Sequence, residues 1–204
     1  VAIKDPTSAS LRRFAGSHLA LIGQQDEPAL AITTAALLAS CAAHRVDDLR
    51  AIVLDGTTAD DPNAGYLDAV AGHLPHRIER PDFRGVSDAI LEIGRELASR
   101  IEEGRVDGPT ILLMVHGLQR FRVLRRSEDD FGFSTDEGPP TPDKVFGEIL
   151  REGPEHGVHV VLWADTVATF ERCVDRQGMR AIDQKAMFQV GATDSSTQIG
   201  RAHV

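Results

Sequence analysis

Short apolar runs alternate with longer amphipathic segments along this chain. Apolar runs of about four to eight residues that end at polar residues or glycine are typical of strands buried on both faces of a parallel sheet. We interpret six runs as strands: residues 19–22, 49–54, 76–79, 110–115, 159–163 and 186–190. The run from Thr110 to Val115 is the most hydrophobic, which favours a central position in the sheet.

Segments with helical spacing separate these runs. One face of the segment 86–101 carries apolar residues at steps of three and four positions: Val86, Ile90, Ile93, Leu97 and Ile101. Gly104 is expected to end that helix. Pro28 opens an alanine- and leucine-rich helix, and further helices are predicted over residues 64–74 and 143–155 and in turns between 166 and 183. Strands that alternate with helices in this way predict an α/β domain with a mainly parallel sheet.

The connection between the first predicted strand and the first predicted helix has the order of a phosphate loop. In P-loop nucleotidases, the motif Gly-x-x-x-x-Gly-Lys-Ser/Thr places backbone N–H groups and a lysine around phosphate. Gly23 fits the first glycine, whereas Pro28 replaces the second. The candidate nucleotide-binding loop is Gly23, Gln24, Gln25, Asp26, Glu27, Pro28, Ala29 and Leu30. It lacks the lysine and the hydroxyl residue, and Asp26 and Glu27 add negative charge, so the loop is degenerate.

Length and charge limit the function classes. A chain of 204 residues suits one domain with a sizeable core. The net charge of −9 disfavours a generally basic nucleic-acid surface, although short basic loops remain compatible with it. Cys41 and Cys173 lack metal or redox spacing and are expected to be free thiols in a reducing compartment. No apolar run approaches the about 20 residues of a membrane helix, so we expect no membrane contact within this stretch.

Both ends of the sequence suggest a fragment of a longer protein. Val1 starts an extended lead-in, residues 1–16, without an initiator methionine. Residues 199–204 resemble a translated sequencing adapter and are interpreted as a non-native tail. The domain is therefore assigned to residues 17–198 and is expected to continue beyond them. Residues 126–142 are acidic and rich in glycine, proline and serine, which predicts a mobile loop.

Four stretches, in order along almost the whole chain, match motifs of one ATPase family. They are Ser17–Gly23, Pro109–Val115, Glu155–Trp163 and Phe188–Ser196. In that order they resemble the lead into the phosphate loop, the strand with the metal-binding aspartate, the sensor strand, and a late strand with an Asp-Ser-Arg turn. The family is that of the FtsK/SpoIIIE DNA translocases, to which the type VII secretion ATPases also belong. The resemblance implies a three-layer RecA-like P-loop fold with a mainly parallel sheet, truncated at the C-terminus.

The departures from the family pattern fall on the residues of catalysis. His116 and Gly117 stand where the family has the aspartate that positions magnesium and the glutamate that polarises water. Asp165 stands at the sensor glutamine, and Ser196 at the arginine of the late turn. We therefore expect no catalytic residue, no metal site and no cofactor. ATP and Mg²⁺ would be the cofactors if the site were active.

Three hypotheses follow. The first is a catalytically inactive module with a structural or regulatory role in a larger DNA translocase or secretion motor. Its partners would be other ATPase domains of the same polypeptide or of a homo-oligomeric ring, and DNA is a further candidate partner. The module would lie in the cytoplasm, or on the cytoplasmic side of a membrane-anchored bacterial protein. The second is an active ATP-driven DNA translocase with an atypical site, in which Arg12 and Arg13 supply the missing cation. The third is an unrelated α/β domain that binds a small ligand near Gly23 and Asp55.

Other polar residues have a structural interpretation beside the functional one. Asp55 is expected to stabilise a turn, His116 to be a hydrogen-bonded structural histidine, and His159 and Trp163 to pack within their strand. The most basic patch consists of Arg120, Arg122, Arg125 and Arg126. It could contact DNA phosphates or a neighbouring subunit. Pairing with the adjacent acidic residues 128–130 is the favoured interpretation.

Overall fold

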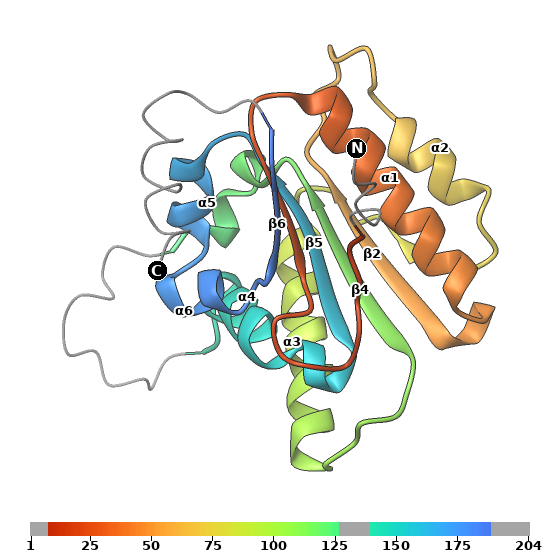
Figure 1. Ribbon diagram of the computed structural model, residues 1–204, viewed down its shortest axis with the longest axis vertical. Helices are drawn as coiled ribbons and strands as arrows, with labels where there is room; N and C mark the ends of the chain where they lie inside the picture. Colours follow the sequence, from red (N-terminus) through yellow and green to blue (C-terminus); the bar gives the residue numbers. More distant parts are fainter. Residues whose placement is uncertain (1–7, 127–138, 189–204) are drawn as a thin grey trace, which may run out of the picture.

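A computed structural model of the chain describes residues 8–126 and 139–188, which form a three-layer α/β fold (Figure 1). The sheet has the strand order β3-β2-β4-β5-β1-β6, and every neighbouring pair is parallel. The strands are β1 (Leu19–Ile22), β2 (Leu49–Asp55), β3 (Arg77–Glu79), β4 (Thr110–His116), β5 (Val158–Ala164) and β6 (Gln184–Met187). The prediction of a mainly parallel sheet is confirmed. β5 separates β1 from β4, so the first strand and the most hydrophobic strand are not neighbours.

Helices cover both faces of the sheet. The helices are α1 (Asp26–Ala43), α2 (Tyr66–Gly72), α3 (Val86–Glu102), α4 (Pro142–Glu152), α5 (Val167–Cys173) and α6 (Arg176–Arg180). Short 3₁₀ helices join them: η1 (Val46–Asp48), η2 (Leu118–Arg120), η3 (Arg122–Leu124) and η5 (Pro154–His156). Side chains alternate between the faces along each strand, so the sheet separates two hydrophobic cores. One core lies under α1 and α2, and the other lies under α3, α4, α5 and α6.

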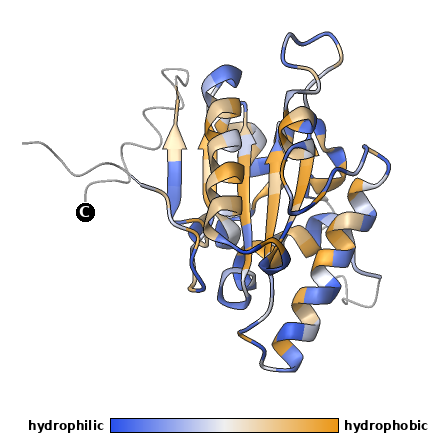
Figure 2. Ribbon diagram, turned by 90° about the vertical axis from the view of Figure 1, so that its right-hand side faces the viewer, coloured by the Kyte–Doolittle hydropathy of each residue, from blue (hydrophilic) through white to orange (hydrophobic). Residues whose placement is uncertain are grey.

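The central strands consist largely of hydrophobic residues, as Figure 2 shows by their orange colour. The side chains of β4 from Ile111 to Val115 are at most 2% exposed, as expected for a strand with helices on both faces. The amphipathic helix predicted over residues 86–101 is α3, and Val86, Ile90, Ile93 and Leu97 are its buried apolar side chains. The expected fifth member, Ile101, is 44% exposed.

Element boundaries differ from the prediction by up to three residues, as α1, α4 and β6 illustrate. α1 begins at Asp26 rather than Pro28, because the first turn of a helix needs no backbone donor and therefore accepts proline at its third position. α4 ends at Glu152, since Gly153 and Pro154 interrupt the predicted helix, and η5 follows. β6 occupies residues 184–187 instead of 186–190.

Several sequence-based predictions lie outside the described residues. These are the first part of the lead-in over residues 1–16, most of the loop predicted over residues 126–142, Ser196, and the tail over residues 199–204. Pro142, at the end of the predicted loop, is the first residue of α4. Cys41 and Cys173 are both buried free thiols. Within the described part of the chain, no helix is both long enough and apolar enough to cross a bilayer.

Candidate functional site

Three neighbouring strands end in one row at the carboxyl edge of the sheet. Asp55 of β2 pairs in register with His116 of β4, and His116 pairs with Trp163 of β5. Residues in register on parallel strands point to the same face, which here is the face covered by α1. Open α/β sheets bind ligands at this edge, so the fold brings these predicted residues to the expected place.

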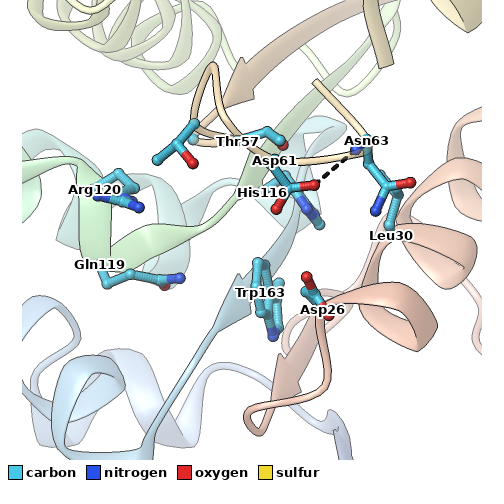
Figure 3. A pocket seen from close by; sticks show the side chains of 11 residues that line it. Asp26, Leu30, Thr57, Asp61, Asn63, His116, Gln119, Arg120 and Trp163 are labelled. Carbon is cyan, nitrogen blue, oxygen red and sulfur yellow. Dashed lines mark hydrogen bonds between the residues drawn. The ribbon is translucent and has the colours of Figure 1, made fainter. Parts of the chain in front are cut away.

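A small cavity lies at this row. Its volume is about 80 Å³, and its polar and aromatic lining includes Asp26, Asp61, His116, Gln119, Arg120 and Trp163 (Figure 3). Pockets for drug-sized ligands measure about 300–1,000 Å³, so this cavity suits a small group rather than a nucleotide. Asp26 and His116 were candidates from the sequence. Asp61 and Gln119 were not, because Asp61 lies in a loop and Gln119 in the short 3₁₀ helix η2, and neither segment has a periodic sequence signal.

The connection after β1 is shorter than a phosphate loop. It comprises Gly23, Gln24 and Gln25, because α1 already begins at Asp26. Pro28, Ala29 and Leu30, which we placed in the loop, therefore belong to α1. The remaining turn has the sharp backbone bend that only glycine adopts readily, since Gly23 has a φ of +143°.

The hydrogen bonds of this connection are made within the protein. The Gly23 N–H donates to the carbonyl of Ala164 at 3.0 Å, and the Gly23 carbonyl accepts from Nε1 of Trp163 at 2.9 Å. The N–H of Glu27 donates to Oδ1 of Asp26 at 2.9 Å. A phosphate loop must direct such N–H groups at its ligand, and here two of them are already engaged.

His116 is buried, with 3% of its surface exposed, and its ring lies 4.7 Å from that of Trp163. Its Nδ1 has no hydrogen-bond partner, so the expectation of a hydrogen-bonded histidine is wrong at this atom. Burial lowers the pKa of His116, while the carboxylates of Asp55, Asp26 and Asp61 act in the opposite direction. A buried nitrogen without a partner is costly, which makes His116 the least satisfied member of the row.

The structure describes two other residues that depart from the family motifs, Gly117 and Asp165. Gly117 has φ +83° and ψ 57°, a left-handed conformation in which the family's glutamate would be strained. The N–H of Asp165 donates to Oε1 of Gln119, and its Oδ1 accepts from the Thr166 hydroxyl at 3.2 Å. Asp165 does not belong to the cavity lining. Ser196 lies outside the described residues.

The cations proposed for an active site lie at the wrong edge. The guanidinium of Arg13 donates to the carbonyls of Val106 and Gly108, which precede β4. The N–H of Arg12 donates to Oγ of Ser17, which precedes β1. The guanidinium of Arg13 and the backbone of Arg12 therefore lie at the amino edge of the sheet, whereas Gly23 lies at the carboxyl edge. The idea that they complete the phosphate site is not supported.

Arg120 supplies the positive charge that lines the cavity. It belongs to the basic patch predicted from the sequence, whose other described contacts include a bond from Arg125 to the Gln119 carbonyl at 3.0 Å. The acidic residues 128–130, proposed as partners of this patch, lie outside the described residues. Among the described lysines, Lys144 belongs to α4 and Lys185 to β6, and neither lines the cavity.

The structural interpretations of three other residues hold. Oδ1 of Asp55 accepts the N–H of Thr57 at 2.9 Å and so stabilises the turn after β2. His159 is buried and bonds through Nδ1 to the carbonyl of Ser17 at 2.9 Å. Trp163 packs in the core under α1. Over residues 8–126 and 139–188, no group of three or more His, Cys, Asp or Glu side chains is arranged to hold a metal ion.

Comparison with known proteins identifies the fold. No family model matches the sequence, and no curated protein is similar to it. EssC (ATPases 2 and 3) from Geobacillus thermodenitrificans is similar with a TM-score of 0.64 and 16% identity, over 92% of this chain and 35% of that one. The cytoplasmic domain of the type VII secretion ATPase EccC from Thermomonospora curvata gives a TM-score of 0.62 and 15% identity, over 86% of this chain and 20% of that one.

A second structure of Thermomonospora curvata EccC (ATPases 2 and 3), in complex with a signal sequence peptide, gives a TM-score of 0.58 and 12% identity, over 87% of this chain and 30% of that one. This chain thus spans between a fifth and about a third of the length of these proteins. EccC is described as a type VII secretion ATPase, the family to which the sequence resemblance pointed, and this chain shares the α/β fold of the EssC and EccC structures.

Proposed function

We propose that this chain is a non-hydrolysing module with an ATPase fold, and that it serves a structural or regulatory role in a larger secretion or translocation motor. The similar structures of EssC and EccC contain ATPases 2 and 3 together, which supports a partnership with further ATPase domains. The cytoplasmic origin of the EccC structure supports a cytoplasmic location.

The hydrogen-bonded turn at Gly23 is the observation that carries this proposal. Its glycine donates to β5 and accepts from Trp163, so it presents no cradle for phosphate. The helix that follows opens with the carboxylates of Asp26 and Glu27. A helix N-terminus favours anions, but here it already carries two of its own, and a triphosphate would be repelled.

The residues at the family's magnesium-binding and water-activating positions, His116 and Gly117, support the same conclusion. Histidine is a poor ligand for Mg²⁺, and glycine has no group to activate water. The left-handed backbone at Gly117 also opposes a simple return to glutamate. Single placed groups in phosphoryl transfer are each worth about 10²- to 10⁵-fold in rate, so the loss of several leaves no useful turnover.

The test is a titration of the protein with MgATP, together with an assay of phosphate release. The single tryptophan, Trp163, lines the cavity and reports binding by its fluorescence. We expect no saturable signal and no phosphate release above that of buffer. Saturable binding of MgATP with steady turnover would overturn the proposal.

An active ATPase with an atypical site is the second candidate, because Arg120 lines the cavity and could face a phosphate. The variant Arg120→Gln separates the two functions. Any phosphate release that belongs to this site should fall in that variant, whereas release by a contaminating ATPase should not change. Arg13→Gln is the matched control, since Arg13 lies at the opposite edge of the sheet.

A further inference from the structure

The lining of the cavity at His116 includes two carboxylates with acceptor positions left open. The carboxylates of Asp26 and Asp61 line it, and so does His116, whose Nδ1 is buried without a partner. Oδ1 of Asp26 accepts the N–H of Glu27, and Oδ1 of Asp61 accepts the N–H of Asn63 at 2.7 Å. Each carboxylate therefore keeps Oδ2 as a further acceptor. Figure 3 shows these side chains converging from α1, from the loop after β2 and from the end of β4.

The charges around the cavity are predominantly negative. Asp26 and Asp61 oppose the single cation Arg120, and Asp55 lies close enough to act on the charge of His116. Arg120 also interacts with Asp60 in the neighbouring loop. A cavity with two carboxylates beside a buried imidazole would be satisfied by a positively charged group that carries several N–H donors.

We propose that this cavity binds a guanidinium or ammonium group. The N–H donors of such a group meet Oδ2 of Asp26 and Oδ2 of Asp61 beside the buried ring of His116, and the indole of Trp163 provides an aromatic wall that attracts cations. A volume of about 80 Å³ holds a few water molecules or one such head group, but not a nucleotide.

The neighbouring groove provides room for the rest of the ligand. It measures about 710 Å³ and shares Gly56, Thr57, Thr58 and Arg120 with the cavity. Phe83 lines this groove with 58% of its surface exposed, and its ring lies 5.3 Å from that of Phe121. The carbon stem of an arginine, lysine or alkylamine can lie against such an aromatic surface while its head group enters the cavity.

This inference concerns the same edge of the sheet as the proposed function but does not depend on it. The absence of ATP turnover would leave the cation site untested, and a failure of the cation site would leave the degenerate phosphate loop as it is. The two experiments use different ligands and therefore fail separately.

The test is a fluorescence titration of Trp163 with ethylguanidinium at constant ionic strength. Ethylurea, which has a similar shape but no charge, is the ligand control, and circular dichroism shows that the fold persists at each concentration. We expect a saturable change with ethylguanidinium and none with ethylurea. The variants Asp26→Asn and Asp61→Asn should each weaken binding at least tenfold.

Asp47→Asn is the matched control variant, because it removes one exposed carboxylate from η1 at the amino edge. It should bind ethylguanidinium as the unchanged protein does. Binding that is equal in the Asp26, Asp61 and Asp47 variants, a signal shared by ethylurea, or no saturable signal would each overturn the proposal. The last result would mean that water alone fills the cavity.

A second arm distinguishes the sources of the cationic group. Sedimentation velocity is measured at rising protein concentration for the unchanged protein and for Asp61→Asn. Association that Asp61→Asn weakens at least tenfold assigns the cation to a side chain of a second copy. A protein that binds ethylguanidinium and stays monomeric assigns it to a free small molecule or to a different domain.

Discussion

His18 and His116 are buried histidines at opposite edges of the same sheet, and they differ in their hydrogen bonds. His18 is 0% exposed, and both ring nitrogens are engaged. Its Nδ1 accepts the N–H of Val160 at 2.8 Å, and its Nε2–H donates to the carbonyl of Leu150 at 3.0 Å. His116 is 3% exposed, and its Nδ1 has no partner.

This difference separates a structural polar residue from a candidate functional one. A buried polar group whose bonds are complete ties elements together and has no capacity left for a ligand. His18 ties β5 to the end of α4 in this way. A buried group with an open position instead costs stability unless something occupies it, and such groups gather at functional sites.

The replacement of each histidine by leucine tests this comparison most strongly. His18→Leu leaves the N–H of Val160 and the carbonyl of Leu150 buried without partners, which should lower the free energy of unfolding by about 4 kcal/mol. His116→Leu breaks no hydrogen bond at Nδ1 and should change that free energy by less than about 1 kcal/mol. Urea denaturation followed by circular dichroism measures both, and equal losses would contradict the comparison.

The pH dependence of stability should follow from the same contrast. Burial lowers the pKa of His18 from its ordinary 6.5 to about 4. The unfolded chain therefore binds a proton that the folded chain excludes, and the free energy of unfolding should fall as the pH drops through 6.5 towards 4. At full effect the loss from His18 is about 3 kcal/mol. Denaturation curves recorded at several pH values give this slope.

His18→Leu provides the control for that slope. Its stability should depend less on pH than that of the unchanged protein. Some dependence should remain, because burial also lowers the pKa of His116 and of His159. An identical slope in both proteins would show that His18 is not the group responsible.

Trp163 should matter more for stability than its neighbour His116. Trp163→Phe keeps an aromatic ring but removes the Nε1–H that bonds the carbonyl of Gly23. We expect a loss of about 2 kcal/mol in the free energy of unfolding, since that carbonyl loses its partner. Circular dichroism with urea measures the loss, and native-state hydrogen exchange of the Gly23 amide should become faster. A loss no greater than that of His116→Leu would argue against a tightly bound turn.

The fold was predictable because the central strands of the sheet are largely apolar. A strand buried on both faces is largely apolar, and β2, β4 and β5 were therefore placed within one residue of their ends. β6 was misplaced because it lies at the edge of the sheet and begins with Gln184 and Lys185, which carry no apolar signal. The early start of α1 was missed because proline suits several positions of a first helical turn.

The candidate site was predictable only where it coincides with strand ends. Asp55 and His116 follow apolar runs, so their place at the carboxyl edge could be inferred from the sequence. Asp61 reaches the cavity through a loop whose path depends on tertiary packing, which no local pattern encodes. The sequence already argued against Arg13 as a cation for the loop at Gly23, because residues that shortly precede a strand lie at its amino end, whereas Gly23 follows that strand.

Arg120 and Arg13 allow a test that compares the carboxyl and amino edges of the sheet, and its expected effect is the smallest. Arg120 repels any cation that enters the cavity, by about 1 kcal/mol at the distances and dielectric of a protein surface. Arg120→Gln should therefore tighten the binding of ethylguanidinium about fivefold. Arg13→Gln removes the same charge from the amino edge, where its guanidinium bonds two backbone carbonyls, and should leave that binding unchanged. If Arg120→Gln instead weakened the binding of ethylguanidinium, Arg120 would stabilise the site rather than repel the ligand. The negative charge of Asp26 and Asp61 would then not be what selects the ligand.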